Sequence, residues 1–232
     1  MPKPAPKGCG LFAGRAEWGM SLILQKWTHV ATKTDRALIL PDGCRDLILW
    51  ERPDAAPVWR LSALQAAPET AALQKGTKLT GFRLAPGVQV PQALLYALPK
   101  DAAGAEADIS GAVMAAGDAM ATIAVLKNAP SVGAGAKILG VSVRSLHRRM
   151  LRDTGFAPIF WLRLARVRRA ALRLGEPFAD LAADSGFSDQ AHMTREFQRW
   201  FGMSPRGLRG SLDLRTQLHQ PALATGEQIS IR

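Results

Sequence analysis

Two stretches of the sequence carry polar and basic side chains whose types and spacing suit the reading of DNA bases. One lies within residues 142–152 and is rich in arginine; the other lies within residues 188–195 and contains Gln190 and Arg195. Arginine can pair bidentately with O6 and N7 of guanine, and glutamine with N6 and N7 of adenine. Apolar residues recur at helical spacing in both stretches, so each is predicted to form a helix with one buried and one exposed face.

The elements that position the second stretch are predicted by residues that start and stop helices. Gly186 can adopt the positive φ of a tight turn, and Ser188 or Asp189 can cap the following helix by accepting hydrogen bonds from its free N–H groups. Gly202 is predicted to end that helix, and Ser204, followed by proline, to cap the next one. The residues predicted to face the core of this unit are Met193, Phe197 and Trp200.

The first stretch repeats this pattern. Gly140 is predicted to make the turn and Ser142 to cap the helix, while Leu146 and Met150 face the core one helical turn apart. Each stretch is therefore predicted to be the second helix of a helix-turn-helix unit, the helix that enters the major groove.

A linker helix is predicted between the two units, over residues 158–174, with proline in its first turn and glycine after its end. Its apolar residues, which can pack against both units, are Phe160, Trp161, Leu164, Val167, Ala171 and Leu174. Its arginines are predicted to face outward: Arg163, Arg166, Arg168, Arg169 and Arg173. Either all of them are solvated, or one or two of them contact phosphate groups of DNA.

The run Gly186-Phe187-Ser188-Asp189-Gln190, with residues 194–197 and 201–205, resembles the second helix-turn-helix of AraC/XylS-type bacterial transcription regulators. Residues 136–155 resemble the first. The resemblance implies a sequence-specific DNA-binding regulator that reads two successive major-groove segments. It implies DNA contacts from Ser142, Arg144, Ser145, His147, Arg148, Arg149, Arg152, Ser188, Gln190, Ala191, His192, Thr194 and Arg195. For Arg195 a salt bridge to a helix neighbour is the alternative.

Charge is concentrated in the same part of the chain. Residues 130–210 carry 14 basic and 6 acidic side chains, whereas residues 1–129 carry 14 and 11. Thirteen of the 14 basic residues in the first range are arginines, which suit phosphate and guanine. Charge alone would equally suit an acidic protein or a membrane surface.

The N-terminal half is predicted to be β-rich. Residues 21–30, 37–40, 47–50, 58–61 and 79–84 are rich in branched and aromatic side chains and alternate with turn residues. Pro41-Asp42-Gly43 predicts a turn, with residues 38–40 and 47–49 as two paired strands beside it.

Two phrases, Leu40-Pro41-Asp42-Gly43-Cys44-Arg45-Asp46-Leu47 and residues 81–87, resemble a small β-rich domain found on a subset of the same family. This resemblance implies a barrel-like domain that senses a small molecule or dimerises. The expected fold class is α+β: a β-rich barrel-like N-terminal domain, then an all-α domain with two helix-turn-helix units joined by a linker helix.

The chain is expected to divide at residues 128–135, which are rich in glycine, alanine and proline. The expected parts are a β-rich domain with C-terminal helices (1–127), a DNA-binding domain (128–210) and a loosely ordered tail (211–232). Within the first part, residues 1–10 are expected to be mobile. Helices are predicted at 91–98 and 109–127, with a loop near 101–105.

Catalysis and metal binding are not expected. Cys9 and Cys44 are too few for a zinc cluster, and His29 is the only histidine before residue 147. A nucleophilic cysteine would need an oriented base, so Cys44 is interpreted as a small turn residue and His29 as a strand residue. No cofactor, no signal peptide and no membrane span are expected.

The expected partner is double-stranded DNA, which implies a cytoplasmic, nucleoid-associated protein. RNA polymerase, a small-molecule effector of unknown identity and a second copy of the chain are further partners consistent with a regulator, for instance an activator. Two alternatives remain: an N-terminal domain that serves only protein–protein contact, and an enzyme with a DNA-binding appendage.

Overall fold

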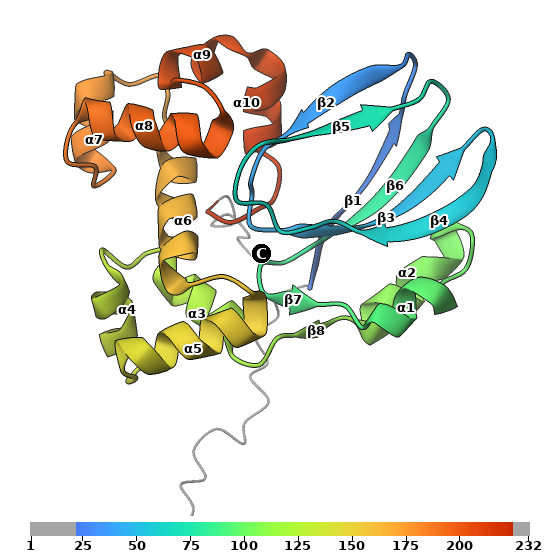
Figure 1. Ribbon diagram of the computed structural model, residues 1–232, viewed down its shortest axis with the longest axis horizontal. Coiled ribbons are helices and arrows are strands. Elements are labelled where there is room, and N and C mark those ends of the chain that lie inside the picture. Colours follow the sequence, from blue (N-terminus) through green and yellow to red (C-terminus); the bar gives the residue numbers. More distant parts are fainter. Residues whose placement is uncertain (1–21, 225–232) are drawn as a thin grey trace, which may run out of the picture.

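The computed structural model describes residues 22–224 and confirms a β-rich region followed by a helical one (Figure 1). The segment expected to be mobile, residues 1–10, lies outside the described residues. A four-stranded antiparallel sheet has the strand order β1-β6-β3-β4. These strands are β1 (Ile23–Val30), β3 (Arg45–Arg52), β4 (Ala55–Leu61) and β6 (Lys78–Leu84). Two smaller sheets pair β2 (Asp35–Ile39) with β5 (Glu69–Leu73), and β7 (Val88–Gln89) with β8 (Met114–Ala115).

One face of the four-stranded sheet is covered by two helices, α1 (Gln92–Ala97) and α2 (Ala102–Ala112) (Figure 1). Leu47 and Leu49 alternate along β3 with less buried residues, and both are fully buried against this layer. Leu94 and Ile109 of the helices belong to the same core. This period-two burial is what one covered sheet face requires.

The strand pairing predicted around residues 41–43 is wrong, although the turn chemistry there is confirmed. Gly43 has φ +80°, and the Asp42 carboxylate accepts a 2.8 Å hydrogen bond from the Cys44 N–H. The strands on either side nevertheless belong to different sheets, because β2 pairs with β5 and β3 pairs with β4 and β6. The sequence pattern missed β5, because its residues Glu-Thr-Ala-Ala-Leu contain a single β-branched side chain, that of Thr70, and no aromatic one.

The helices predicted between residues 91 and 127 also need correction. Residues 102–105 begin α2 instead of forming a loop, because the Asp101 carboxylate caps that helix by accepting from the Gly104 N–H at 2.8 Å. The helix predicted over 109–127 is interrupted at 113–118 by β8 and by Gly117, whose φ is +50°. Helix α3 (Ala119–Leu126) then follows.

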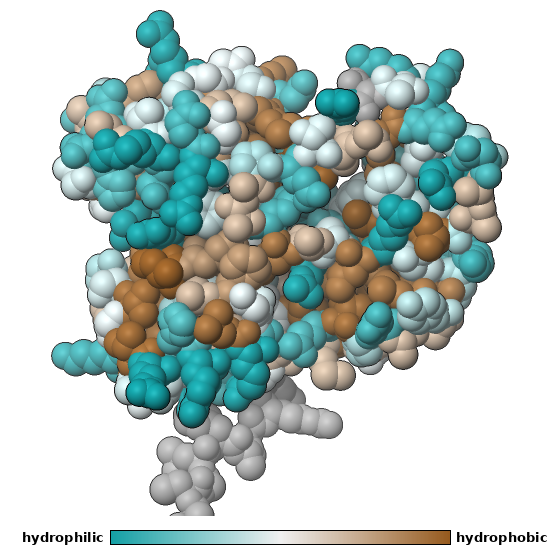
Figure 2. All heavy atoms as spheres, viewed as in Figure 1, coloured by the Kyte–Doolittle hydropathy of each residue, from teal (hydrophilic) through white to brown (hydrophobic). Residues whose placement is uncertain are grey.

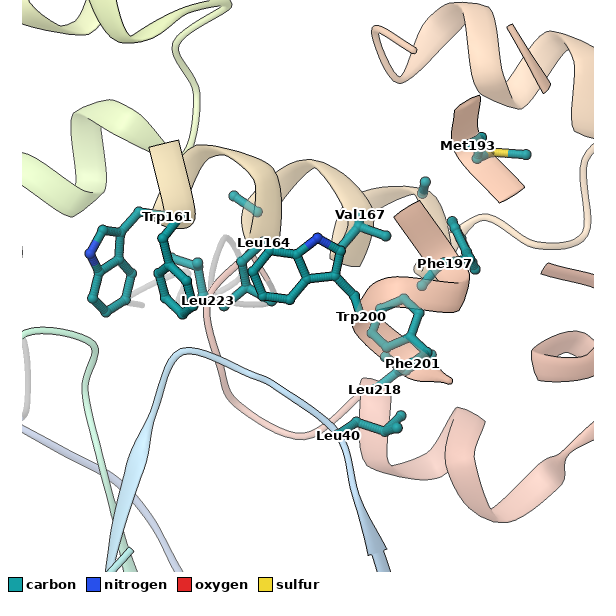
Figure 3. Packing of buried hydrophobic residues seen from close by; sticks show 14 of the residues in the cluster. Leu40, Trp161, Leu164, Val167, Met193, Phe197, Trp200, Phe201, Leu218 and Leu223 are labelled. Atoms are coloured by element: carbon teal, nitrogen blue, oxygen red, sulfur yellow. The ribbon is translucent and has the colours of Figure 1, made fainter. Parts of the chain in front are cut away.

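The helical region extends beyond the predicted boundary at residue 210. Its helices are α4 (Val132–Ile138), α5 (Val143–Thr154), α6 (Pro158–Leu172), α7 (Phe178–Asp184), α8 (Gln190–Phe201), α9 (Pro205–Gly210) and α10 (Leu212–Leu218). Residues 211–224 are therefore not the loosely ordered tail that was expected; residues 225–232 lie outside the described part. Leu214, Leu218 and Leu223 are buried in the core that also contains Leu164 and Trp200, because their apolar side chains complete it (Figure 3).

Arg168 corrects the prediction that every linker-helix arginine faces outward. Its side chain is buried with 1% exposure, and its guanidinium donates to the carbonyl oxygens of Leu223, Pro41 and Leu218 at 3.0, 3.2 and 3.1 Å. It lies between Leu164 and Ala171 on the buried face of α6. Arg168 thus ties the linker helix to both the β-rich region and the C-terminal segment.

A second buried arginine continues this contact into the sheet. Arg83 of β6 pairs with Asp42 at 3.0 Å and with Asp46 at 3.3 Å, and it donates to the Gln220 side chain and the Pro221 carbonyl. Burial raises the pKa of the Asp42 carboxyl, and the nearby Arg83 and Arg168 offset only part of that effect. The loop around Asp42, the sheet and the C-terminal segment therefore form one polar junction.

Candidate nucleic-acid interface

The first helix-turn-helix unit consists of α4, a turn at Gly140 and α5. Gly140 has φ +65°, and the Ser142 hydroxyl accepts from the Ser145 N–H at 3.1 Å to cap α5. Leu146 and Met150 are buried with 1% exposure each, as their spacing predicts. The unit therefore leaves one face of α5 free for a ligand.

The free face of α5 carries a dense positive charge. Arg144, His147, Arg148 and Arg149 are exposed, whereas Ser145 is half-buried and its hydroxyl lies 3.0 Å from that of Ser142. Arg152, at the last turn, is exposed but forms a two-bond pair with Asp153 at 2.7 and 3.1 Å. Its charge is thus partly balanced, whereas no ion pair within residues 22–224 involves Arg144, Arg148 or Arg149.

The second unit consists of α7, a turn at Gly186 and α8. Gly186 has φ +74°, and the Asp189 carboxylate accepts from the His192 N–H at 2.6 Å. This hydrogen bond lowers the pKa of Asp189, and the smaller effect of burial, which raises the pKa, offsets it only in part. Gly202 ends α8 with φ +71°, and Ser204 caps α9. The predicted starts and ends of these helices are confirmed.

The apolar face of α8 packs on the linker helix. Met193, Phe197 and Trp200 are buried, as is Phe201, and Figure 3 shows Trp200 of α8 beside Leu164 and Val167 of α6. On the other face Ser188, Gln190, Ala191 and Arg195 are exposed, and Thr194 is half-buried with its hydroxyl donating to the Gln190 carbonyl. Within the described residues no ion pair holds Arg195 to a helix neighbour, so its guanidinium is available.

His192 also has a role in the turn that the sequence pattern did not reveal. Its Nδ1 lies 3.1 Å from the Ser188 hydroxyl oxygen and 3.3 Å from the Ser188 backbone N, and its ring meets Phe187 edge-on at 5.5 Å. Because the Ser188 N–H donates to Nδ1, the remaining nitrogen, Nε2, is the one that could reach DNA. The i to i+4 spacing of Ser188 and His192 could have indicated this contact.

The two units stand at opposite ends of α6 (Figure 1). Helix α6 has 15 residues and is therefore about 22 Å long at 1.5 Å per residue. Figure 2 shows hydrophilic surface over both ends of the helical region and a more hydrophobic band between them. The site is thus two separated polar faces on one rigid support.

The residues considered for catalysis in the β-rich region have no partners suited to it. Burial raises the pKa of the Cys44 thiol well above its usual value, which disfavours the thiolate. His29 is exposed on β1, opposite Leu79 of β6. Among residues 22–224 there is no cluster of three His, Cys, Asp or Glu side chains able to hold a metal ion, and no helix there is long and apolar enough to cross a membrane.

Comparison with known proteins identifies the helical region. A helix-turn-helix domain family matches residues 136–211. The HTH-type transcriptional activator RhaS of Enterobacter sp. (strain 638) is 34% identical over 85 residues, which are 35% of this chain and 31% of the relative. RhaS of Escherichia coli (strain SE11) is 37% identical over 81 residues, or 34% of this chain and 29% of the relative. The chain thus spans about a third of the length of these relatives.

Solved structures are similar at lower identity. A transcriptional regulator from Chromobacterium violaceum, described as having an AraC-type DNA-binding domain, is 24% identical, with a TM-score of 0.35 over 44% of this chain and 91% of that one. ToxT from Vibrio cholerae is 9% identical, with a TM-score of 0.41 over 80% of this chain and 97% of that one. The family match and the RhaS relatives confirm the resemblance, and residues 136–211 form a helix-turn-helix domain of the AraC/XylS type.

Proposed function

We propose that the protein is a sequence-specific transcription regulator that binds double-stranded DNA through two successive major-groove segments. The observation that carries this proposal is the pair of units at the two ends of α6, each with a capped second helix whose free face is polar. A helix-turn-helix reads bases from the exposed face of its second helix. Two such helices on one support allow a single chain to read two short DNA segments, here called boxes.

The exposed side chains suit that task. Arg148 and Arg195 can pair with guanine and Gln190 with adenine, each such bidentate pair being worth about 1–3 kcal/mol of discrimination against a wrong base. Further candidates for base or phosphate contacts are Arg144, His147, Arg149, His192 and Thr194. Candidates for contacts at the edge of the DNA interface are Ser142, Ser145, Ser188, Ala191 and Arg152. The matched relatives are transcriptional activators and not enzymes. The proposal includes activation of transcription, contact with RNA polymerase and association with the nucleoid in the cytoplasm.

The N-terminal region is proposed to bind an effector or to dimerise the protein. Two observations support a link to DNA binding: the junction of Arg168 with the loop at Pro41, and a groove of about 240 Å³ between Arg45 of β3 and Arg152 at the end of α5. Either event would act on the linker helix through these contacts. Light scattering with and without candidate small molecules distinguishes the two, because dimerisation doubles the mass.

The test of DNA binding uses the full chain. A genome-wide binding profile should return a shared pair of short boxes, and the purified chain should bind that DNA with an affinity that falls steeply as salt rises, through counterion release. A double variant, Arg148→Ala with Arg195→Ala, should lose the preference for the boxes while keeping the fold. If the wild-type chain shows no preference for any enriched DNA at low salt, the proposed function is wrong.

A further inference from the structure

A groove runs between the two helix-turn-helix units, across the first half of α6. It has a volume of about 310 Å³ and is lined by the start of α4, by α6 and by the turn into α8. Val132, Ile159 and Leu162 form its apolar part, and Arg163 and Arg166 are its basic residues. The groove is therefore lined by residues of both units and of the linker helix between them.

The linker-helix arginines have different partners, and most are already engaged. Arg168 is buried, and Arg169 donates to the Lys127 carbonyl and to Asn128 beyond the end of α3. Arg173 pairs with Glu176 at 2.6 Å and with Asp184 at 3.2 Å. The guanidinium groups of these three arginines are bonded to other groups of the protein, and none of the three lines the groove.

Two arginines remain at the groove. Arg166 donates to the Pro130 carbonyl at 3.4 Å and lies 6.0 Å from the centre of the Phe187 ring, so it is fixed in place. Arg163 is exposed, and within the described residues it has neither a hydrogen-bond nor an ion-pair partner. The carboxylate that also lines the groove, Glu196, accepts from the Trp200 indole N–H at 3.1 Å. Two guanidinium groups thus outnumber one carboxylate there.

We propose that Arg163 binds the phosphodiester backbone of the DNA segment between the two boxes, with Arg166 adding positive potential beside it. The proposal rests on the proposed function, since it requires both units to occupy major grooves of one duplex. A strand that leaves one major groove and enters the next must then pass the face of α6 between them. An arginine fork suits a phosphate in that position because it can donate two parallel hydrogen bonds.

A phosphate contact has a measurable signature. Loss of one contact reduces the slope of log affinity against log salt by about 0.9, which corresponds to about eightfold weaker binding at 0.1 M salt. It does not alter which base pairs are preferred, because a phosphate carries no sequence information. A base contact at the same residue would change the preferred sequence instead.

The experiment measures binding of the full chain to a two-box DNA over a series of salt concentrations, for the wild type, Arg163→Gln and Arg163→Lys. Arg60→Gln is the matched control, because Arg60 is an exposed arginine on β4 that stacks on Trp50, away from the helical region. We expect Arg163→Gln to lose about one unit of slope with unchanged base preference, and Arg163→Lys and Arg60→Gln to keep the wild-type slope. Phosphate ethylation should interfere with wild-type binding between the boxes, and that interference should vanish in Arg163→Gln.

A wild-type slope and wild-type interference in Arg163→Gln would overturn the proposal and would favour a protein partner on the apolar part of the groove. A shift in base preference would overturn it too, since Arg163 would then read a base. Failure of the wild-type chain itself to prefer two-box DNA is a different result, because it contradicts the proposed function as a whole.

Discussion

The two helix-turn-helix units share their turn but differ in the surface they expose. Both have a glycine of positive φ before a side-chain cap, and both end the second helix with glycine in the left-handed region. Helix α5, however, carries four arginines and a single carboxylate, whereas α8 carries two arginines, one glutamate and an aspartate cap. A common backbone therefore supports two kinds of surface: α5 has more positive charge to add phosphate contacts beside any base contact, whereas α8 has less charge and more neutral hydrogen-bonding side chains.

Both units are carried by α6, and Arg168 is the joint that fixes this helix to the β-rich region and the C-terminal segment. Arg168→Met should destabilise the protein by about 3–5 kcal/mol, because it leaves three buried carbonyl oxygens without their donors and removes one of the two positive charges near Asp42. Urea unfolding of the full chain measures the loss.

Arg163→Met is the control from the same helix, since an exposed side chain should cost no more than about 0.5 kcal/mol. Equal unfolding midpoints for the two variants would show that Arg168 is not part of the joint.

The position of Arg168 shows where sequence reasoning was sufficient and where it was not. Gly140, Gly186 and the cap at Ser142 were predicted correctly, and Asp189 is one of the two caps predicted for α8, because each depends on backbone geometry within a few residues. Arg168 was misplaced because its charge was given more weight than its spacing from Leu164 and Ala171, which puts it on the apolar stripe.

The remaining errors concern contacts between distant residues. The pairing of β2 with β5 and the packing of α10 under the β-rich region depend on segments far apart in the chain, as in the hydrogen bond from Gln217 to the Leu38 carbonyl. The local sequence pattern of a segment does not indicate which distant segment it contacts. The polar faces of α5 and α8, by contrast, follow from helical periodicity alone, so the candidate interface was more predictable than the fold around it.

The contrast between the two interfaces predicts different losses from one substitution in each. Arg195→Ala in α8 should weaken binding to the best site by about 1–3 kcal/mol and relax the preference at particular base pairs. Arg149→Ala in α5 should weaken all sequences alike and reduce the salt slope by about one. Arg152→Ala should have a smaller effect of this second kind, since Asp153 already balances its charge.

Competition binding against a library of box sequences, repeated at several salt concentrations, measures both quantities. Equal and sequence-independent losses for Arg195→Ala and Arg149→Ala would contradict the division between the two units.

The smallest expected effect concerns the two caps. The pKa of Asp189 is lowered because its carboxylate accepts the His192 N–H, so the stabilisation it gives is complete above its usual pKa of 3.8 and is lost as pH falls through the lower folded value. The Ser142 hydroxyl of the first unit does not titrate. In an NMR titration the His192 amide should shift with a midpoint below 3.8, while the Ser145 amide shows no such step. A midpoint at or above 3.8 would mean that Asp189 does not cap α8 in solution.

We propose that both units read one duplex through a rigid linker helix, and DNA spacing tests this arrangement most directly. Major grooves on one face of DNA recur every 34–36 Å, or about 10–10.5 base pairs, so inserting about five base pairs between the boxes turns one box to the far side. The full chain should then bind only as tightly as it binds a single box, and its footprint should cover one box, whereas replacing five base pairs without changing the length should have little effect. Unchanged affinity and an intact footprint over both boxes after the insertion would contradict the claim.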